Sequence, residues 1–271
     1  MALTGFQLAV CRLIARHRIA GGEAYVAGGA ALNALAAAAR VSRDIDLFHD
    51  TEEAVLSSFD GDRVLLTEAG CSVVTTRERP TFVEAVVTRG TESVTLQWTS
   101  DSAFRFFPLI EHPDFGLAMH PFDLATNKVL ALVGRLEPRD WVDVITCHDR
   151  IQPLGYLAWA ACGKDPGFSP AAILAHAGRS SRYTDVELRS LAFEGESPTA
   201  ADLSQRWHAM LAEARDLVGL LPAEHAGTCV LDSDLTLFRG GAGALRLALG
   251  VGGVQFHPGS IRGAWPRIRE R

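Results

Sequence analysis

A pair of glycines between a short apolar run and a helix-forming stretch constrains this chain more than any other feature. Residues 24–27 (AYVA) have the character of a buried strand, Gly28-Gly29 interrupts them, and residues 30–39 are rich in alanine. Residues 44–48 (DIDLF) then alternate acidic and apolar side chains, which is typical of a strand. The order of strand, diglycine, helix and alternating strand predicts an α/β domain.

The two acids of this segment favour a metal site. Asp44 and Asp46 are two positions apart, so on a strand they project from the same face. Two neighbouring carboxylates repel each other unless a cation lies between them, and Mg²⁺ binds one or two carboxylates together with substrate phosphates. Gly28 and Gly29, having no side chains, let a phosphate approach the backbone and the first N–H groups of the following helix. Together these features predict a triphosphate site.

Each half of this pattern also has a simpler interpretation. A diglycine is often a tight turn, and paired acids on an edge strand can serve solubility. It is their combination in one short segment that favours the functional interpretation.

The remaining sequence predicts a second, helical region. Residues 71–76, 81–89 and 92–98 are rich in Val and Thr and read as antiparallel strands, whereas 99–120 look irregular. From Pro121 onward the pattern becomes helical. We therefore expect a first domain over residues 1–118, a helical domain over 119–226 and a C-terminal segment of unknown role over 227–271.

Composition limits the class of protein. The net charge is −6, which gives no overall basic surface for nucleic acid. The five cysteines are scattered and odd in number, which argues against a disulfide framework and favours a reducing compartment. No apolar stretch is long enough for a membrane span, and the N-terminus does not read as a secretory signal. We expect a cytoplasmic protein.

Two motifs carry a resemblance to a known family. The string GGAALNALAAAARVSRDIDLF, with its spacing of Arg40, Ser42, Asp44 and Asp46, resembles the first motif of AbiEii-type nucleotidyltransferase toxins. That family is built on the DNA-polymerase-β palm. About 80 residues later, FDLATNK at 122–128, then Arg135 and RDWVD at 139–143, are similar to the family's second segment. The resemblance covers roughly residues 20–150.

The resemblance implies a mixed-sheet palm followed by an α-helical domain that completes the site. It implies transfer of a nucleoside monophosphate from an NTP to a hydroxyl, with an RNA acceptor such as the tRNA 3′ end, and pairing with an antitoxin or a phage-defence role. It assigns the triphosphate to Gly28 and Gly29 and Mg²⁺ to Asp44 and Asp46. It assigns phosphate contact to Lys128 and places two acids on the helical side, Asp140 and Asp143.

Three of these assignments have alternatives. Lys128 is one of only two lysines among 26 basic residues, and a compact charge suits phosphates, but a solvated position on a helix face is the simpler interpretation. Asp140 and Asp143 share one helix face and could instead form a stabilising ion-pair set with Arg139. Ser42 could bond a phosphate or cap its own loop.

One departure from the superfamily pattern concerns the third carboxylate, which in most members lies on a neighbouring strand and acts as general base and metal ligand. The strand register places Gln97 at that position, and glutamine cannot usefully accept a proton. Glu84, Glu92 or Asp101 could substitute, the substrate's own phosphate could take the proton, or activity is weak. A nucleotide-binding protein that has lost catalysis and a small-molecule (antibiotic) nucleotidyltransferase therefore remain alternatives.

Overall fold

The computed structural model describes residues 3–22, 24–179 and 183–267. The chain divides into two compact units. The first comprises Met1–Ala103 and Leu109–His120, and the second comprises Phe104–Pro108 and Pro121–Arg271.

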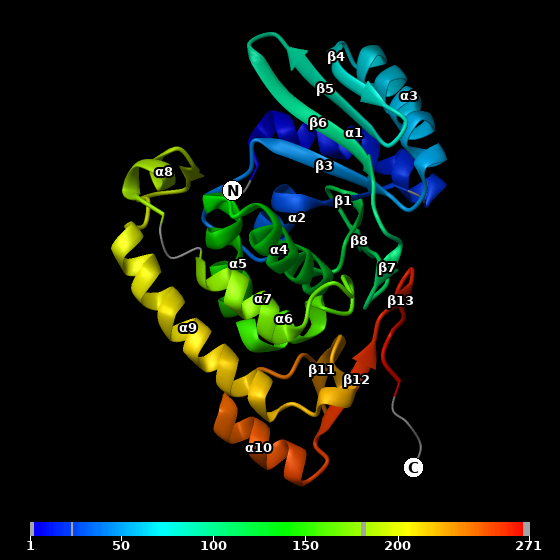
Figure 1. The fold of residues 1–271 in the computed structure, drawn as a ribbon. Helices are drawn as coiled ribbons and strands as arrows, with labels where there is room; N and C mark the ends of the chain where they lie inside the picture. Colours follow the sequence, from blue (N-terminus) through cyan, green and yellow to red (C-terminus); the bar gives the residue numbers. More distant parts are fainter. Residues whose placement is uncertain (1–2, 23, 180–182, 268–271) are drawn as a thin grey trace. The chain divides into compact units, whose positions relative to one another are not determined.

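The first unit is built on a seven-stranded mixed sheet (Figure 1). Its strand order is β4-β5-β6-β3-β1-β9-β8; β3 runs parallel to β6 and β1 parallel to β9, and the other neighbours are antiparallel. The strands are β1 Ala24–Ala27, β3 Asp44–His49, β4 Ser72–Arg79, β5 Phe82–Arg89, β6 Glu92–Ser100, β8 Ile110–His112 and β9 Gly116–Ala118. This mixed sheet confirms the predicted palm class.

Helices α1 (Gly5–Gly21) and α3 (Glu52–Glu68) pack against one another and against the sheet. A capping box formed by Thr4 and Gln7 begins α1. On the buried face of β6, Trp98 packs edge-on against Phe59 of α3 and donates its indole N–H to Asp62 at 2.9 Å. We therefore expect functional side chains on the opposite face of β6 and its neighbouring strands.

Two local predictions were wrong. The helix after the diglycine, α2, spans only Gly28–Leu35, because Ala36 leaves the helical path and Ala37 adopts a positive φ of 49°. The chain then turns into the short strand β2 (Arg40–Val41). Residues 99–120 contain β8 and β9, which join the sheet although the segment around them is rich in phenylalanine and proline. In both places tertiary pairing overrides local propensity.

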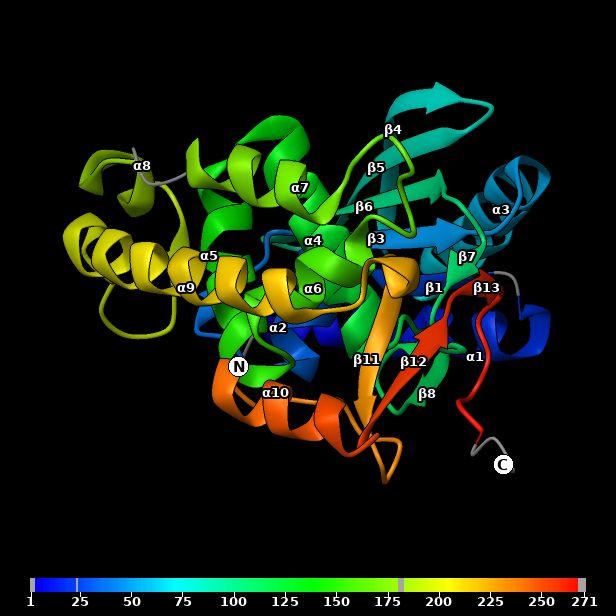
Figure 2. The same cartoon turned by 60° about the horizontal axis from the view of Figure 1, so that its bottom comes forward.

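The second unit is mostly helical (Figure 2). Its helices are α4 Pro121–Arg135, α5 Pro138–Arg150, α6 Leu154–Ala161, α7 Pro170–Ala177, α8 Asp185–Arg189, α9 Ala200–Leu220, the 3₁₀ turn η2 Ala223–His225 and α10 Ala242–Gly250. Its strands are β7 Phe104–Arg105, β10 Ala192–Phe193, β11 Thr228–Asp232, β12 Val254–Pro258 and β13 Ser260–Ile261.

Strand β11 and helix α10, which lie in the C-terminal part of the chain, contribute to the core of this unit. β11 pairs with β12, and Val230 of β11 and Leu245 of α10 join a buried cluster with Tyr156 of α6 and Leu217 of α9. Within the described part of the chain, every helix is too short or too polar to span a lipid bilayer.

A buried ion pair stabilises the segment that follows β7. Asp123 is fully buried, and its two carboxylate oxygens accept the backbone N–H groups of Phe106 and Phe107 at 2.9 and 3.0 Å. Lys164 Nζ lies 2.9 Å from Asp123 Oδ1 and donates to Asn127 Oδ1 at 2.7 Å. Asp123 therefore has a structural role in holding the 104–108 segment.

Candidate active site

The diglycine bend and the second acid of β3 lie against each other in the first unit. β1 and β3 pair antiparallel with Ala27 opposite Asp46, so the strand end that leads into Gly28 lies beside that carboxylate. Gly28 has a φ of +64°, and a Cβ atom built there would lie 1.7 Å from Asp46 Oδ2. Only glycine fits at this position, for both conformational and steric reasons. Two motifs that are 18 residues apart in the sequence thus form one structural feature.

The second glycine lies beside a buried cation. A Cβ atom on Gly29 would lie 2.6 Å from Arg40 Nη2 and 3.2 Å from Ser42 Oγ. Arg40 is buried, so its guanidinium is held close to the start of α2. Arg40 had no predicted role beyond its place in the spacing of the first motif. Its place in the Arg-x-Ser-x-Asp motif is the sequence feature from which a role for Arg40 could have been predicted.

Ser42 serves the loop that precedes β3. Its hydroxyl donates to the backbone carbonyl of Asp44 at 3.0 Å, and Gln7 Nε2 donates to the Ser42 carbonyl at 3.1 Å. This geometry fits the loop-capping interpretation, because the hydroxyl hydrogen is used within the loop. The oxygen of Ser42 still lies next to Gly29.

Asp44 and Asp46 share one half-buried face of β3, while Ile45 and Leu47 are buried on the other. The alternation read from the sequence is therefore present in the structure. Across the described residues, no group of three or more His, Cys, Asp and Glu side chains is arranged to hold a metal ion. Two hard carboxylate oxygen donors beside a glycine backbone fit Mg²⁺, which commonly takes one or two protein carboxylates and completes its shell with phosphate or water.

The row of side chains continues onto two further strands. Asp46 is opposite Gln97 of β6, and Gln97 is opposite Glu84 of β5. Gln97 Nε2 donates to Glu84 Oε2 at 3.0 Å. Glu92 lies at the hairpin end of β6 opposite Arg89, and Asp101 lies beyond the end of that strand. Of the three acids considered as substitutes, Glu84 is the one in the Asp46 row.

In the second unit, Lys128 is buried in an ion-pair cluster. Lys128 Nζ lies 2.9 Å from Asp143 Oδ2 and 3.2 Å from Asp140 Oδ1. Arg135 contacts both oxygens of Asp140, with Nε at 2.6 Å and Nη2 at 2.9 Å. Burial by itself would raise the pKa of Asp140, but Arg135 and Lys128 outweigh it and the pKa is lowered.

The solvated-lysine interpretation is therefore wrong. The ion-pair interpretation holds for Asp140 and Asp143, with Lys128 and Arg135 as the cations in place of the expected Arg139. Arg139 pairs instead with Glu137 at 2.6 Å, where both side chains are half-buried.

Solved structures resemble this chain at low sequence identity. JHP933 from Helicobacter pylori aligns with a TM-score of 0.50 and 14% identity, covering 79% of this chain and 91% of that one. MenT4, a nucleotidyltransferase toxin from Mycobacterium tuberculosis, aligns with a TM-score of 0.51 and 17% identity, covering 80% and 85%. This chain has the nucleotidyltransferase fold. The resemblance inferred from the two motifs is thus confirmed for the fold, although no family model and no curated protein matches the sequence.

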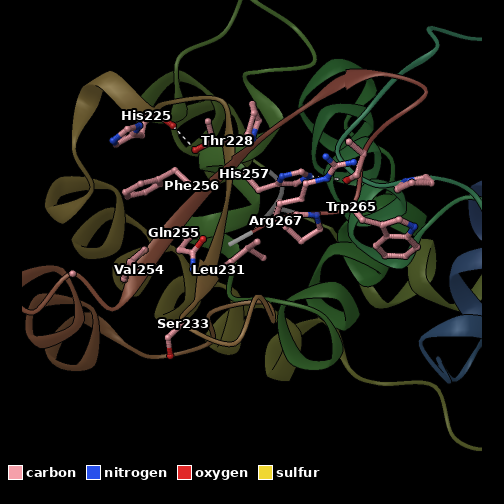
Figure 3. Close-up of a pocket in the computed structure, with 15 residues that line it drawn as sticks. His225, Thr228, Leu231, Ser233, Val254, Gln255, Phe256, His257, Trp265 and Arg267 are labelled. Carbon is pink, nitrogen blue, oxygen red and sulfur yellow. Dashed lines mark hydrogen bonds between the residues drawn. The ribbon is translucent and has the colours of Figure 1, made fainter. Parts of the chain in front are cut away.

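The second unit also has an open cavity of about 1060 Å³ beside β11 and β12 (Figure 3). The cross-strand pair Leu231 and Gln255 lines it, together with Trp265 and Arg267. At its edge, His257 Nε2 lies 2.8 Å from the carbonyl oxygen of Phe106. None of the site residues predicted from the sequence is among those lining this cavity.

Proposed function

We propose that the chain is a Mg²⁺-dependent nucleotidyltransferase that transfers a nucleoside monophosphate from an NTP to a hydroxyl acceptor and releases pyrophosphate. The observation that carries the proposal is the contact between Asp46 and the Gly28 backbone. It brings a carboxylate and a side-chain-free bend together, as a site for a metal-bound polyphosphate requires.

Asp44 and Asp46 are the proposed Mg²⁺ ligands. Their hard oxygen donors and shared face suit this ion, and a bound Mg²⁺ would neutralise charge on the phosphates during transfer. In phosphoryl-type transfer the protein mainly positions groups and stabilises developing charge, so few residues beyond these are needed.

The chain's own residues supply the rest of the nucleotide site. The backbone of Gly28 and Gly29 receives the phosphates, with Ser42 beside it, and the guanidinium of Arg40 adds positive charge at the start of α2. Lys128 is proposed as a further phosphate contact, and its ion pairs with Asp140 and Asp143 fix its position within the second unit. An ammonium group that is already fixed in position loses little conformational freedom when it binds an anion.

The proposed acceptor is an RNA 3′ hydroxyl, and the proposed biological role is that of a toxin paired with an antitoxin protein. The fold similarity to MenT4, a nucleotidyltransferase toxin, supports the toxin role, and the RNA acceptor and the antitoxin follow from the resemblance of the two sequence motifs.

Transfer from α-labelled NTPs tests the proposal. Purified protein is incubated with each NTP, Mg²⁺ and total RNA, and in parallel with aminoglycosides as small-molecule acceptors. We expect label on RNA from one or more NTPs, and none with Asp46→Asn. The matched control is Asp60→Asn, an exposed acid on α3 paired with Arg63, which should transfer like wild type. Label that persists with Asp46→Asn would contradict the proposal, and label on the aminoglycoside alone would change the acceptor class.

Gln97 supports one alternative, a protein that binds nucleotide but no longer transfers it. That alternative predicts Mg²⁺·NTP binding by calorimetry with no labelled product from any acceptor. It also predicts that growth inhibition in an expressing host is unchanged by Asp46→Asn.

A further inference from the structure

Glu84 and Gln97 form a hydrogen-bonded pair on the face of the sheet that carries Asp44 and Asp46. Residues directly opposite each other on neighbouring strands project from the same face. Because Asp46 is opposite Gln97 and Gln97 is opposite Glu84, these three side chains form one row across β3, β6 and β5. Figure 1 shows these three strands side by side.

The hydrogen bond fixes which way the Gln97 amide is turned. A carboxylate only accepts hydrogen bonds, so the amide group facing Glu84 Oε2 is the Nε2 donor, at 3.0 Å. Thr76 of β4 donates its hydroxyl to the other oxygen, Oε1, at 2.8 Å. The carboxylate of Glu84 is therefore held by a donor on each side, and its side chain is only 18% exposed.

Nothing in the buried core explains an acid at this position. The neighbours Val83 and Ala85 point into the core, and Glu84 points to the opposite, half-buried face. Glu84 forms an ion pair with Arg77 of β4, whose Nε lies 3.8 Å from Glu84 Oε1 and whose side chain is 72% exposed. Such an exposed, distant pair contributes little to stability. The hydrogen bonds from Gln97 and Thr76 fix an acid in place without neutralising it.

We propose that Glu84 supplies the third carboxylate of the site, one strand farther from Asp46 than usual, and that Gln97 is the residue that positions it. This inference rests on the proposed function. In the transfer step, the acceptor hydroxyl gives its proton to Glu84 as its oxygen bonds to the α-phosphorus. The bond from that phosphorus to the pyrophosphate oxygen breaks, pyrophosphate leaves, and Glu84 returns the proton to solvent.

The test removes the carboxylate from β5 and then places one on β6 instead. Glu84→Gln should lower kcat by on the order of 10²-fold or more, the range for loss of a general base, and leave the affinity for Mg²⁺·NTP unchanged. The double variant Glu84→Gln/Gln97→Glu should recover much of the lost kcat, because a carboxylate then stands again in the row. The control is Glu92→Gln, an exposed acid at the hairpin end of β6, which should keep wild-type kcat.

Three results are decisive. Wild-type kcat in Glu84→Gln overturns the proposal while leaving the proposed transferase intact. A double variant as slow as Glu84→Gln, with wild-type nucleotide affinity and melting temperature, also overturns it, because it shows that a carboxylate in this row is not what the reaction needs. Absence of transfer by wild-type protein instead refutes the underlying function.

Discussion

Lys128 Nζ lies 2.9 Å from Asp143 Oδ2, and both groups are buried. Asp140 joins the same ammonium at 3.2 Å and is itself bound by Arg135. The cluster thus contains two acids and two cations. Lys164, the other lysine of the chain, is likewise buried against a carboxylate, that of Asp123. Both lysines therefore help to fix the second unit.

Removing the ammonium should destabilise the second unit. Lys128→Met leaves Asp143 buried without that partner, and loss of one member of a buried pair costs about 3–5 kcal/mol. Arg139→Gln breaks the half-buried pair with Glu137, which is more accessible to solvent than the Lys128 cluster, and should cost about 1 kcal/mol or less. Urea unfolding of the three proteins measures the difference. Equal unfolding midpoints would show that the Lys128 cluster contributes no stability.

A methyl group at the bend should disrupt the nucleotide site. Gly28→Ala places a Cβ atom 1.7 Å from Asp46 Oδ2, so either the carboxylate or the bend must move. We expect Mg²⁺·NTP affinity to fall by roughly tenfold or more, equivalent to about 1.4 kcal/mol. Calorimetric titration measures it.

Gly90 provides the matched control for this substitution. It has a similar positive φ, +62°, but no atom outside its two chain neighbours lies within 4 Å of its Cβ position. Gly90→Ala therefore carries the same backbone strain, roughly 1–2 kcal/mol, without the clash. If both alanine variants weaken nucleotide binding equally, contact between Gly28 and Asp46 is not the cause.

His49 should make the fold sensitive to mild acid. Burial lowers its pKa from 6.5 to about 4, even though Nδ1 lies 3.3 Å from the Thr99 carbonyl oxygen. Between these values the unfolded chain binds a proton that the folded chain does not, so stability falls as the pH drops from 6.5 towards 4, by about 3 kcal/mol at most.

His49→Gln cannot titrate in this range and should lose that part of the pH dependence. His208→Gln, an exposed histidine on α9, should retain it. Urea midpoints at pH 7 and pH 4.5 for the three proteins decide the question. The same pH dependence in His49→Gln and wild type would be incompatible with a buried neutral imidazole.

The sequence was most informative where chemistry depends on short-range spacing. The alternation of Asp44 and Asp46 with Ile45 and Leu47 sets their face of β3 without knowledge of the rest of the fold. The register argument that placed Gln97 on the site face of its strand also agrees with the structure, because Val94, Leu96 and Trp98 are all buried.

The pairing of strands that are distant in the sequence could not be predicted from such local patterns. That Gly28 touches Asp46 follows from the antiparallel pairing of β1 with β3, which local patterns do not specify. The choice of Glu84 over Glu92 and Asp101 likewise needs the register between β5 and β6. The ion pairs of Lys128 were missed for a related reason, since helical spacing alone does not reveal that α4 and α5 place Lys128 between Asp140 and Asp143.

The most direct test of the central claim is whether Asp46 makes nucleotide binding depend on Mg²⁺. A non-hydrolysable NTP analogue is titrated into wild type, Asp46→Asn and Asp60→Asn with Mg²⁺ present and with Mg²⁺ chelated. We predict that Mg²⁺ tightens binding by roughly tenfold or more in wild type and Asp60→Asn, and that it has little effect in Asp46→Asn. The same Mg²⁺ dependence in all three proteins would contradict the account.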